Sequence, residues 1–138
     1  TLEVLPNEGK VIGDIFDTDD NTFCGCLNQS IRYLQENTKA QIVVIVMIGS
    51  NTAPPESLNE GRKVPDFVLA EMAEKVAKVN GVPVINVFTE SGFGYARVKN
   101  RDYQKDNIHL NKLGGINMGN FVWSKLKNIP LWETEVEE

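Results

Sequence analysis

The sequence predicts an α/β domain in which a parallel sheet lies between layers of helices. Two segments rich in β-branched residues, 41–47 and 83–88, have the composition of strands that are buried on both faces. Three amphipathic segments alternate with them in the order helix, strand, helix, strand, helix. This alternation favours right-handed crossovers and a three-layer α/β/α architecture.

The first helix is expected to follow a turn-rich segment. Residues 1–20 are acidic and contain glycine and proline, so they are predicted to form a loop, with a short strand near Leu2–Leu5. Asn21 or Thr22 can cap a helix that runs to about Asn37. Its apolar residues form one stripe at helical spacing: Phe23, Leu27, Ile31 and Leu34.

The other two helices have start and stop signals of the same kind. Pro65 lies near the first turn of the second helix and Gly81 lies just past its end. Asn111 is a suitable N-cap for the last helix, which is predicted to run to about Asn128. The apolar stripes of the two helices are Val68, Met72, Val76 and Val79, and then Met118, Phe121, Val122, Leu126 and Ile129.

Two long loops, 48–63 and 89–108, leave the carboxyl ends of the predicted strands. In open α/β sheets, ligands bind beyond the carboxyl ends of the strands. Any site is therefore expected where these loops meet.

Composition excludes several classes of partner. Of the 138 residues, 41% are hydrophobic and 24% are charged, as in ordinary globular domains. The net charge of -5 disfavours nucleic acid as a partner. No apolar run approaches the roughly 20 residues that span a bilayer, and no signal peptide is visible at the first residues.

No cofactor or metal site is expected. Cys24 and Cys26 fall on a predicted helix, where residues two apart point to different faces, so a disulfide between them would be strained. A metal site would need further good ligands, and the chain has a single histidine.

That histidine, His109, follows Asp106 by three residues. An aspartate can bond to one imidazole nitrogen and fix the tautomer, which leaves the other nitrogen to accept a proton from a hydroxyl nucleophile. An acid–histidine pair at this spacing is common by chance, and a surface histidine at a helix start is the alternative. The position of the pair, between a long loop and the last helix, favours a catalytic role.

The surrounding string, 106–114, resembles the final conserved block of the SGNH (GDSL-type) hydrolases. That block reads Asp, any residue, a hydrophobic residue, His, any residue, Asn, two residues, Gly. The matching residues are Asp106, Ile108, His109, Asn111 and Gly114, whereas the family's usual glycine and proline are replaced by Asn107 and Leu110. The resemblance spans roughly residues 20–130. It implies a flavodoxin-like ester hydrolase domain in which Asp106 and His109 are the catalytic acid and base.

The nucleophile that the resemblance implies is missing from its expected place. The family's Gly-Asp-Ser motif stands near the start of the domain, and the chain contains no such motif. Asn51, in Gly49-Ser50-Asn51, imitates the family's oxyanion-hole asparagine but lies too close to Asp106 along the chain. Three of the five serines, Ser50, Ser57 and Ser91, lie in the two long loops. The other two, Ser30 and Ser124, lie within predicted helices.

The sequence therefore predicts the C-terminal part, residues 1–138, of a single SGNH hydrolase-like domain that lacks its N-terminal strands. Its substrate would be a small-molecule or carbohydrate ester, and the missing segment or self-association would complete the sheet. The alternative is a non-catalytic α/β module that binds a carbohydrate or another ligand through the two loops. Phe93, Tyr95 and Tyr103 could stack on such a ligand, although core packing explains them equally well.

Overall fold

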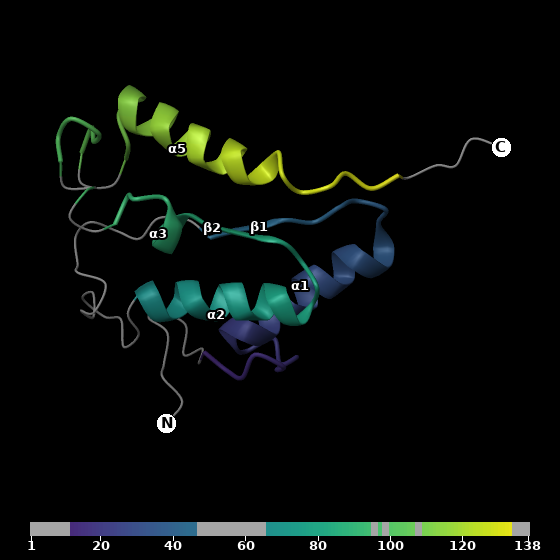
Figure 1. The fold of residues 1–138 in the computed structure, drawn as a ribbon. Helices are drawn as coiled ribbons and strands as arrows, with labels where there is room; N and C mark the ends of the chain where they lie inside the picture. Colours follow the sequence, from purple (N-terminus) through teal and green to yellow (C-terminus); the bar gives the residue numbers. More distant parts are fainter. Residues whose placement is uncertain (1–11, 47–65, 95–96, 98–99, 107–108, 134–138) are drawn as a thin grey trace.

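The protein has a mixed α/β fold, seen in a computed structural model that describes residues 12–46, 66–94, 97, 100–106 and 109–133 (Figure 1). The elements, in chain order, are α1 (Phe23–Asn37), β1 (Val44–Val46), α2 (Asp66–Val79), β2 (Val84–Asn86), α3 (Val87–Glu90) and α5 (Lys112–Leu126). The predicted α/β class and the alternation of long helices with strands are confirmed. No helix in the described ranges is both long enough and apolar enough to cross a membrane.

The two strands pair in parallel, as predicted. Val44 lies opposite Val84, and the last pair joins Val46 to Asn86. Figure 1 shows α1 and α2 on one side of the strand pair and α5 on the other. Side chains alternate between the faces of a strand, so Val44 and Val84 face the α1–α2 side, where they pack on the main core cluster. Ile85 faces the other way and is fully buried, and α5 contacts its strand.

The core lies between α1, α2 and the strands. Its buried members are Ile12, Cys24, Ile31, Val76, Ala77 and Val82. A polar connection runs through it, because Asn28 of α1 is fully buried. Its Nδ2 donates to the carbonyls of Ile15 and Asp17 at 2.9 and 2.8 Å, and its Oδ1 accepts from Asn80 Nδ2 at 2.6 Å. One asparagine thus ties the segment before α1 to the end of α2.

The start of α1 depends on a close backbone approach. Thr22 is the N-cap, and its Oγ1 accepts from the Gly25 N–H at 2.9 Å, as the sequence predicts. A β-carbon on Gly25 would lie 1.8 Å from the Asp19 carbonyl oxygen. A glycine is therefore required where the preceding turn folds back over the helix.

The extent of the strands differs from the prediction. The segment 83–88 was expected to be one strand, but β2 ends at Asn86, and Val87 and Phe88 begin α3. The reason is a capping interaction, because Asn86 Oδ1 accepts from the Thr89 N–H at 3.1 Å and turns the chain into a helix. Of the predicted strand 41–47, β1 covers residues 44–46, residues 41–43 precede it, and Met47 lies outside the described residues. The expected strand near Leu2–Leu5 and the 48–63 loop lie outside the described residues.

The two cysteines of α1 differ in environment. Cys24 is fully buried, whereas Cys26 is partly exposed and its Sγ donates to the Asp20 carbonyl at 2.8 Å. Burial, reinforced by the negative charges of Asp14 and Asp17, raises the pKa of the Cys24 thiol to about 11. Cys24 is therefore a thiol at neutral pH.

Iodoacetamide at pH 8 should label Cys26 in the folded protein and leave Cys24 unmodified. The raised pKa of Cys24 lowers its thiolate fraction on the order of 100-fold relative to the same thiol in urea, and burial slows the reagent further. Mass spectrometry of a Cys26→Ser variant, with and without urea, measures Cys24 alone. Similar labelling rates in both conditions would place Cys24 at the surface and contradict this packing.

Candidate active site

Asp106 and His109 lie together in the loop before α5. Asp106 Oδ1 accepts from the backbone N–H of His109 at 2.7 Å, and Asp106 Oδ2 lies 2.8 Å from His109 Nδ1. One carboxylate therefore holds both the main chain and the ring of the same histidine. The histidine side chain is 72% exposed and the aspartate 48%, so the imidazole is accessible to a ligand.

A short hairpin presents this pair. Gln104, which is 4% exposed, forms an isolated antiparallel bridge with Leu110. The Lys105 N–H donates to the His109 carbonyl at 3.0 Å, and the Asn111 N–H donates to the Tyr103 carbonyl at 2.9 Å. Asp106 and His109 thus lie at the turn of a hydrogen-bonded hairpin. Figure 1 shows this segment beside the start of α5.

Asn111 and Gly114, the two other described motif residues after the histidine, have structural roles. Asn111 Oδ1 accepts from the Gly114 N–H at 2.9 Å and caps α5, while its Nδ2 donates to the Asp102 carbonyl at 2.8 Å. A β-carbon on Gly114 would lie 2.2 Å from the Tyr103 carbonyl oxygen. The asparagine and glycine therefore lock the hairpin against the first turn of α5, which fixes where the histidine stands.

None of the serines in the described ranges stands in contact with His109. The hydroxyls of Ser30 and Ser124 donate to helix carbonyls at 2.8 and 2.7 Å, and Ser91 Oγ accepts from the Phe93 N–H at 3.1 Å. These are ordinary local bonds. Ser50, Ser57 and Asn51 lie outside the described residues, as does the 48–63 loop that was expected to face the pair.

The aromatic residues of the second loop take part in packing. Phe93 is 8% exposed and meets Tyr103 edge to face, with ring centroids 5.8 Å apart. The guanidinium carbon of Arg97 lies 5.5 Å from the centre of the Tyr103 ring. These contacts support the loop that carries the Asp106–His109 pair. Tyr95 lies outside the described residues.

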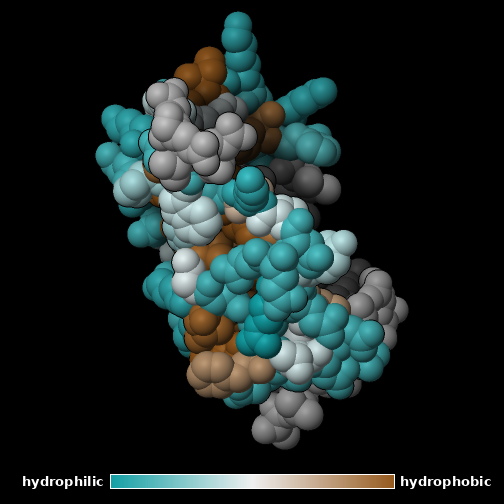
Figure 2. Space-filling view, turned by 90° about the vertical axis from the view of Figure 1, so that its right-hand side faces the viewer, coloured by the Kyte–Doolittle hydropathy of each residue, from teal (hydrophilic) through white to brown (hydrophobic). Residues whose placement is uncertain are grey.

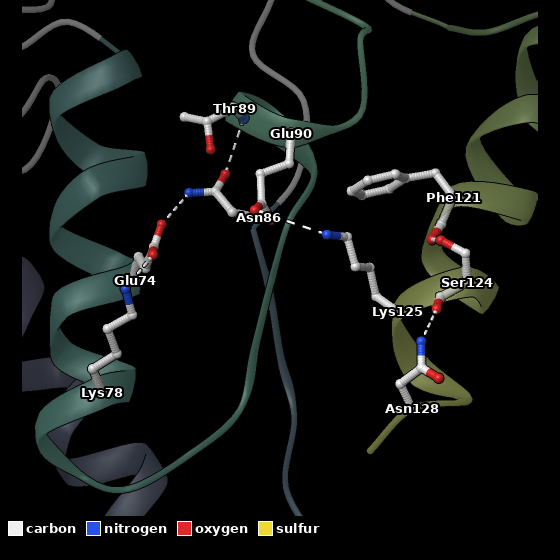
Figure 3. Close-up of polar contacts among 9 residues, drawn as sticks. All are labelled: Glu74, Lys78, Asn86, Thr89, Glu90, Phe121, Ser124, Lys125 and Asn128. Atoms are coloured by element: carbon white, nitrogen blue, oxygen red, sulfur yellow. Dashed lines mark hydrogen bonds and ion pairs between the residues drawn. The ribbon is translucent and has the colours of Figure 1, made fainter.

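A polar network at the end of β2 links this strand to α2 (Figure 3). The sequence alone did not predict this network. Asn86 is 2% exposed, and its Nδ2 donates to Glu74 Oε2 of α2 at 2.6 Å. Glu74 Oε1 also pairs with Lys78 Nζ at 2.5 Å. The bonds from Lys78 and from Asn86 lower the pKa of Glu74. A signal was available in the sequence, because an asparagine three residues before Thr89 is a capping pattern.

Replacing Asn86 by alanine should destabilise the fold by about 2–3 kcal/mol, because the substitution removes a helix cap and a buried hydrogen bond to a carboxylate. The measurement is the urea midpoint at constant m-value. Asn128→Ala is the matched control, because it removes an exposed amide that donates to the Ser124 carbonyl. We expect that variant to lose less than about 0.5 kcal/mol. Equal losses in the two variants would contradict the role of the network.

The lowered pKa of Glu74 predicts how the stability of the fold depends on pH. Its pKa is lower in the folded protein than its ordinary value of 4.5. Its contribution to stability is therefore present above about pH 4.5 and is lost as the pH falls through the folded pKa. In Asn86→Ala the loss of stability on acidification should be smaller than in the unchanged protein, because one of the bonds that lower the pKa of Glu74 is gone.

Comparisons with known proteins show the fold alone. No protein-family model and no curated protein matches the chain. A solved protein from Lactobacillus plantarum, a structural genomics target, superposes with a TM-score of 0.70 at 23% identity over 87% of this chain. A second solved structure gives a TM-score of 0.72 at 20% identity over 86% of this chain. The match covers only 60% and 57% of those two chains, so this chain spans about 60% of the length of the solved proteins that it resembles.

Proposed function

We propose that this chain supplies the aspartate–histidine part of the catalytic triad of a serine ester hydrolase of the SGNH type. The observation that carries the proposal is the double contact between Asp106 and His109, at 2.7 Å to the backbone N–H and 2.8 Å to Nδ1. An acid that contacts its histidine in this way fixes the orientation of the ring as well as its tautomer.

The chemistry follows from that orientation. An ionised Asp106 accepts a hydrogen bond from Nδ1–H of His109, so Nε2 is the nitrogen with a free lone pair. Nε2 would take the proton of a serine hydroxyl as that hydroxyl attacks the ester carbonyl. It would then return the proton to the leaving alcohol. The Asp106 carboxylate stabilises the imidazolium that exists between the two transfers.

The serine is proposed to come from a segment other than the described one. Ser30, Ser91 and Ser124 are engaged in local bonds, and the SGNH resemblance puts the nucleophile on strands upstream of this part of the domain. Those strands would lie beside β1, extend the parallel sheet and complete a flavodoxin-like three-layer fold. They would belong to a longer natural chain or to another chain.

Exposed apolar surface beside β1 supports this completion. Ile45, at the centre of β1, is 43% exposed, whereas its register partner Ile85 is fully buried. A central residue of a parallel sheet is normally covered on its helix side. α5 contacts β2, so this face of β2 is covered by a helix. On β1 the same face remains partly exposed at Ile45.

The test is hydrolysis of a chromogenic acetate ester by a chain that includes the upstream segment. Hydrolysis that depends on both Asp106 and His109 supports the proposal. Hydrolysis that is independent of both residues, or absent in the longer chain, would contradict it.

A further inference from the structure

A pocket of about 370 Å³ lies away from the Asp106–His109 pair, near the residues that precede the two strands. Three segments form it: the end of α1 with the turn that follows (35–42), the turn 81–83, and the tail residues 132–133. The volume falls in the range of about 300–1,000 Å³ that is usual for small-molecule pockets.

The pocket has an apolar floor and an aromatic wall. Ile42, Val82 and Pro83 contribute apolar surface, and Val82 is almost completely buried. Trp132 also lines the pocket but remains 63% exposed. Figure 2 views this side of the molecule and shows hydrophobic side chains at its centre, with polar side chains around and partly over them.

The side chain of Gln41, which lies between the pocket residues Ala40 and Ile42, holds the backbone on both sides of Leu131. Gln41 Nε2 donates to the Pro130 carbonyl at 2.6 Å, and Gln41 Oε1 accepts from the Trp132 N–H at 3.3 Å. The two bonds clamp the tail on either side of Leu131, across about 90 residues of sequence. The backbone of Trp132 is thereby held beside the pocket, and its side chain lines the pocket while staying 63% exposed.

The polar groups of the pocket carry no net charge. Lys39 and Glu133 bear opposite charges, and the other lining residues, Gln35 and Thr38 among them, are neutral. A charged ligand would gain from one of the two charged groups and be repelled by the other. A neutral ligand that both donates and accepts hydrogen bonds can use the ammonium, the carboxylate and the amide together.

We propose that this pocket binds a neutral sugar in its pyranose form. The C–H face of the ring would stack on the exposed indole of Trp132, an aromatic side chain with a large apolar face. The ring hydroxyls would bond to Lys39 and Glu133 at the rim. This site is separate from the proposed esterase function and does not depend on it.

The experiment uses saturation-transfer NMR on the full chain with four probes: the methyl β-pyranosides of glucose and galactose, N-acetylglucosamine, and sodium octanoate as the charged apolar competitor. We expect saturable binding of at least one sugar, with a Kd on the order of 1 mM, equivalent to about -4 kcal/mol. Trp132→Ala should abolish the signal, and Gln41→Ala should weaken binding by about fivefold or more, because the tail is no longer clamped.

Trp123→Ala is the matched control, because Trp123 is equally exposed, at 62%, but lies on α5 outside the pocket. Sugar binding should be unchanged in that variant. Three outcomes would overturn the proposal: no sugar binds, octanoate alone binds, or a sugar signal persists in Trp132→Ala. Circular dichroism of each variant shows that a lost signal does not come from unfolding.

Discussion

His109→Ala is expected to reduce kcat/KM for a chromogenic acetate ester on the order of a thousandfold or more, in a chain that includes the upstream segment. The serine would lose its general base, and the leaving alcohol would lose its proton donor. Residual activity would come from binding and oxyanion stabilisation. The rate is measured at saturating and limiting substrate, so that the loss can be assigned to kcat.

Asp106→Asn tests the second member of the pair. An amide can occupy the same place but can donate to Nδ1, which stabilises the wrong tautomer of His109. The loss should equal that of His109→Ala or be smaller, depending on whether a backbone carbonyl can hold the imidazole instead. Asp102→Asn is the matched control, because Asp102 is exposed and lies in the same loop. We expect its rate to stay within about twofold. Unchanged turnover in His109→Ala would mean that another residue is the base.

The features that the sequence predicted well are those decided by neighbours in the chain. Thr22 and Asn111 cap their helices by bonds to residues three positions later, at 2.9 Å in both cases. The contact between Asp106 and His109 is also local, at a spacing of three residues. Capping and short turns depend on side-chain chemistry that can be inferred without the fold.

The features that the sequence did not predict depend on distant partners. The β2 strand stops at Asn86 because that side chain reaches Glu74 of α2 and caps α3. Gln41 belonged to a predicted strand, but it bonds to Pro130 and Trp132 near the end of the chain. A propensity argument extended the strands to Gln41 at one end and to Val87 and Phe88 at the other, because it has no access to contacts with distant parts of the chain.

The isolated chain of residues 1–138 is expected to show no detectable hydrolysis of a chromogenic acetate ester and to self-associate. A parallel sheet is normally covered on both faces, and two strands are too few for independent stability. Ile45 is 43% exposed on β1, and α5 exposes Leu113, Ile116 and Trp123 by 49%, 51% and 62%. Strand edges and apolar faces of this kind favour association with other chains.

Sedimentation velocity over a range of concentrations measures the association, alongside the esterase assay. Ile116→Lys should shift the protein toward monomer, because it removes apolar surface from the exposed face of α5 and adds charge there. Asn120→Lys is the matched control, because it adds the same charge one helical turn further along α5 at a residue that is already polar and exposed. We expect a smaller shift in that variant. A stable, monomeric and active 138-residue protein would contradict the proposal that another segment completes the domain. Ser50 and Ser91 would then be the candidate nucleophiles.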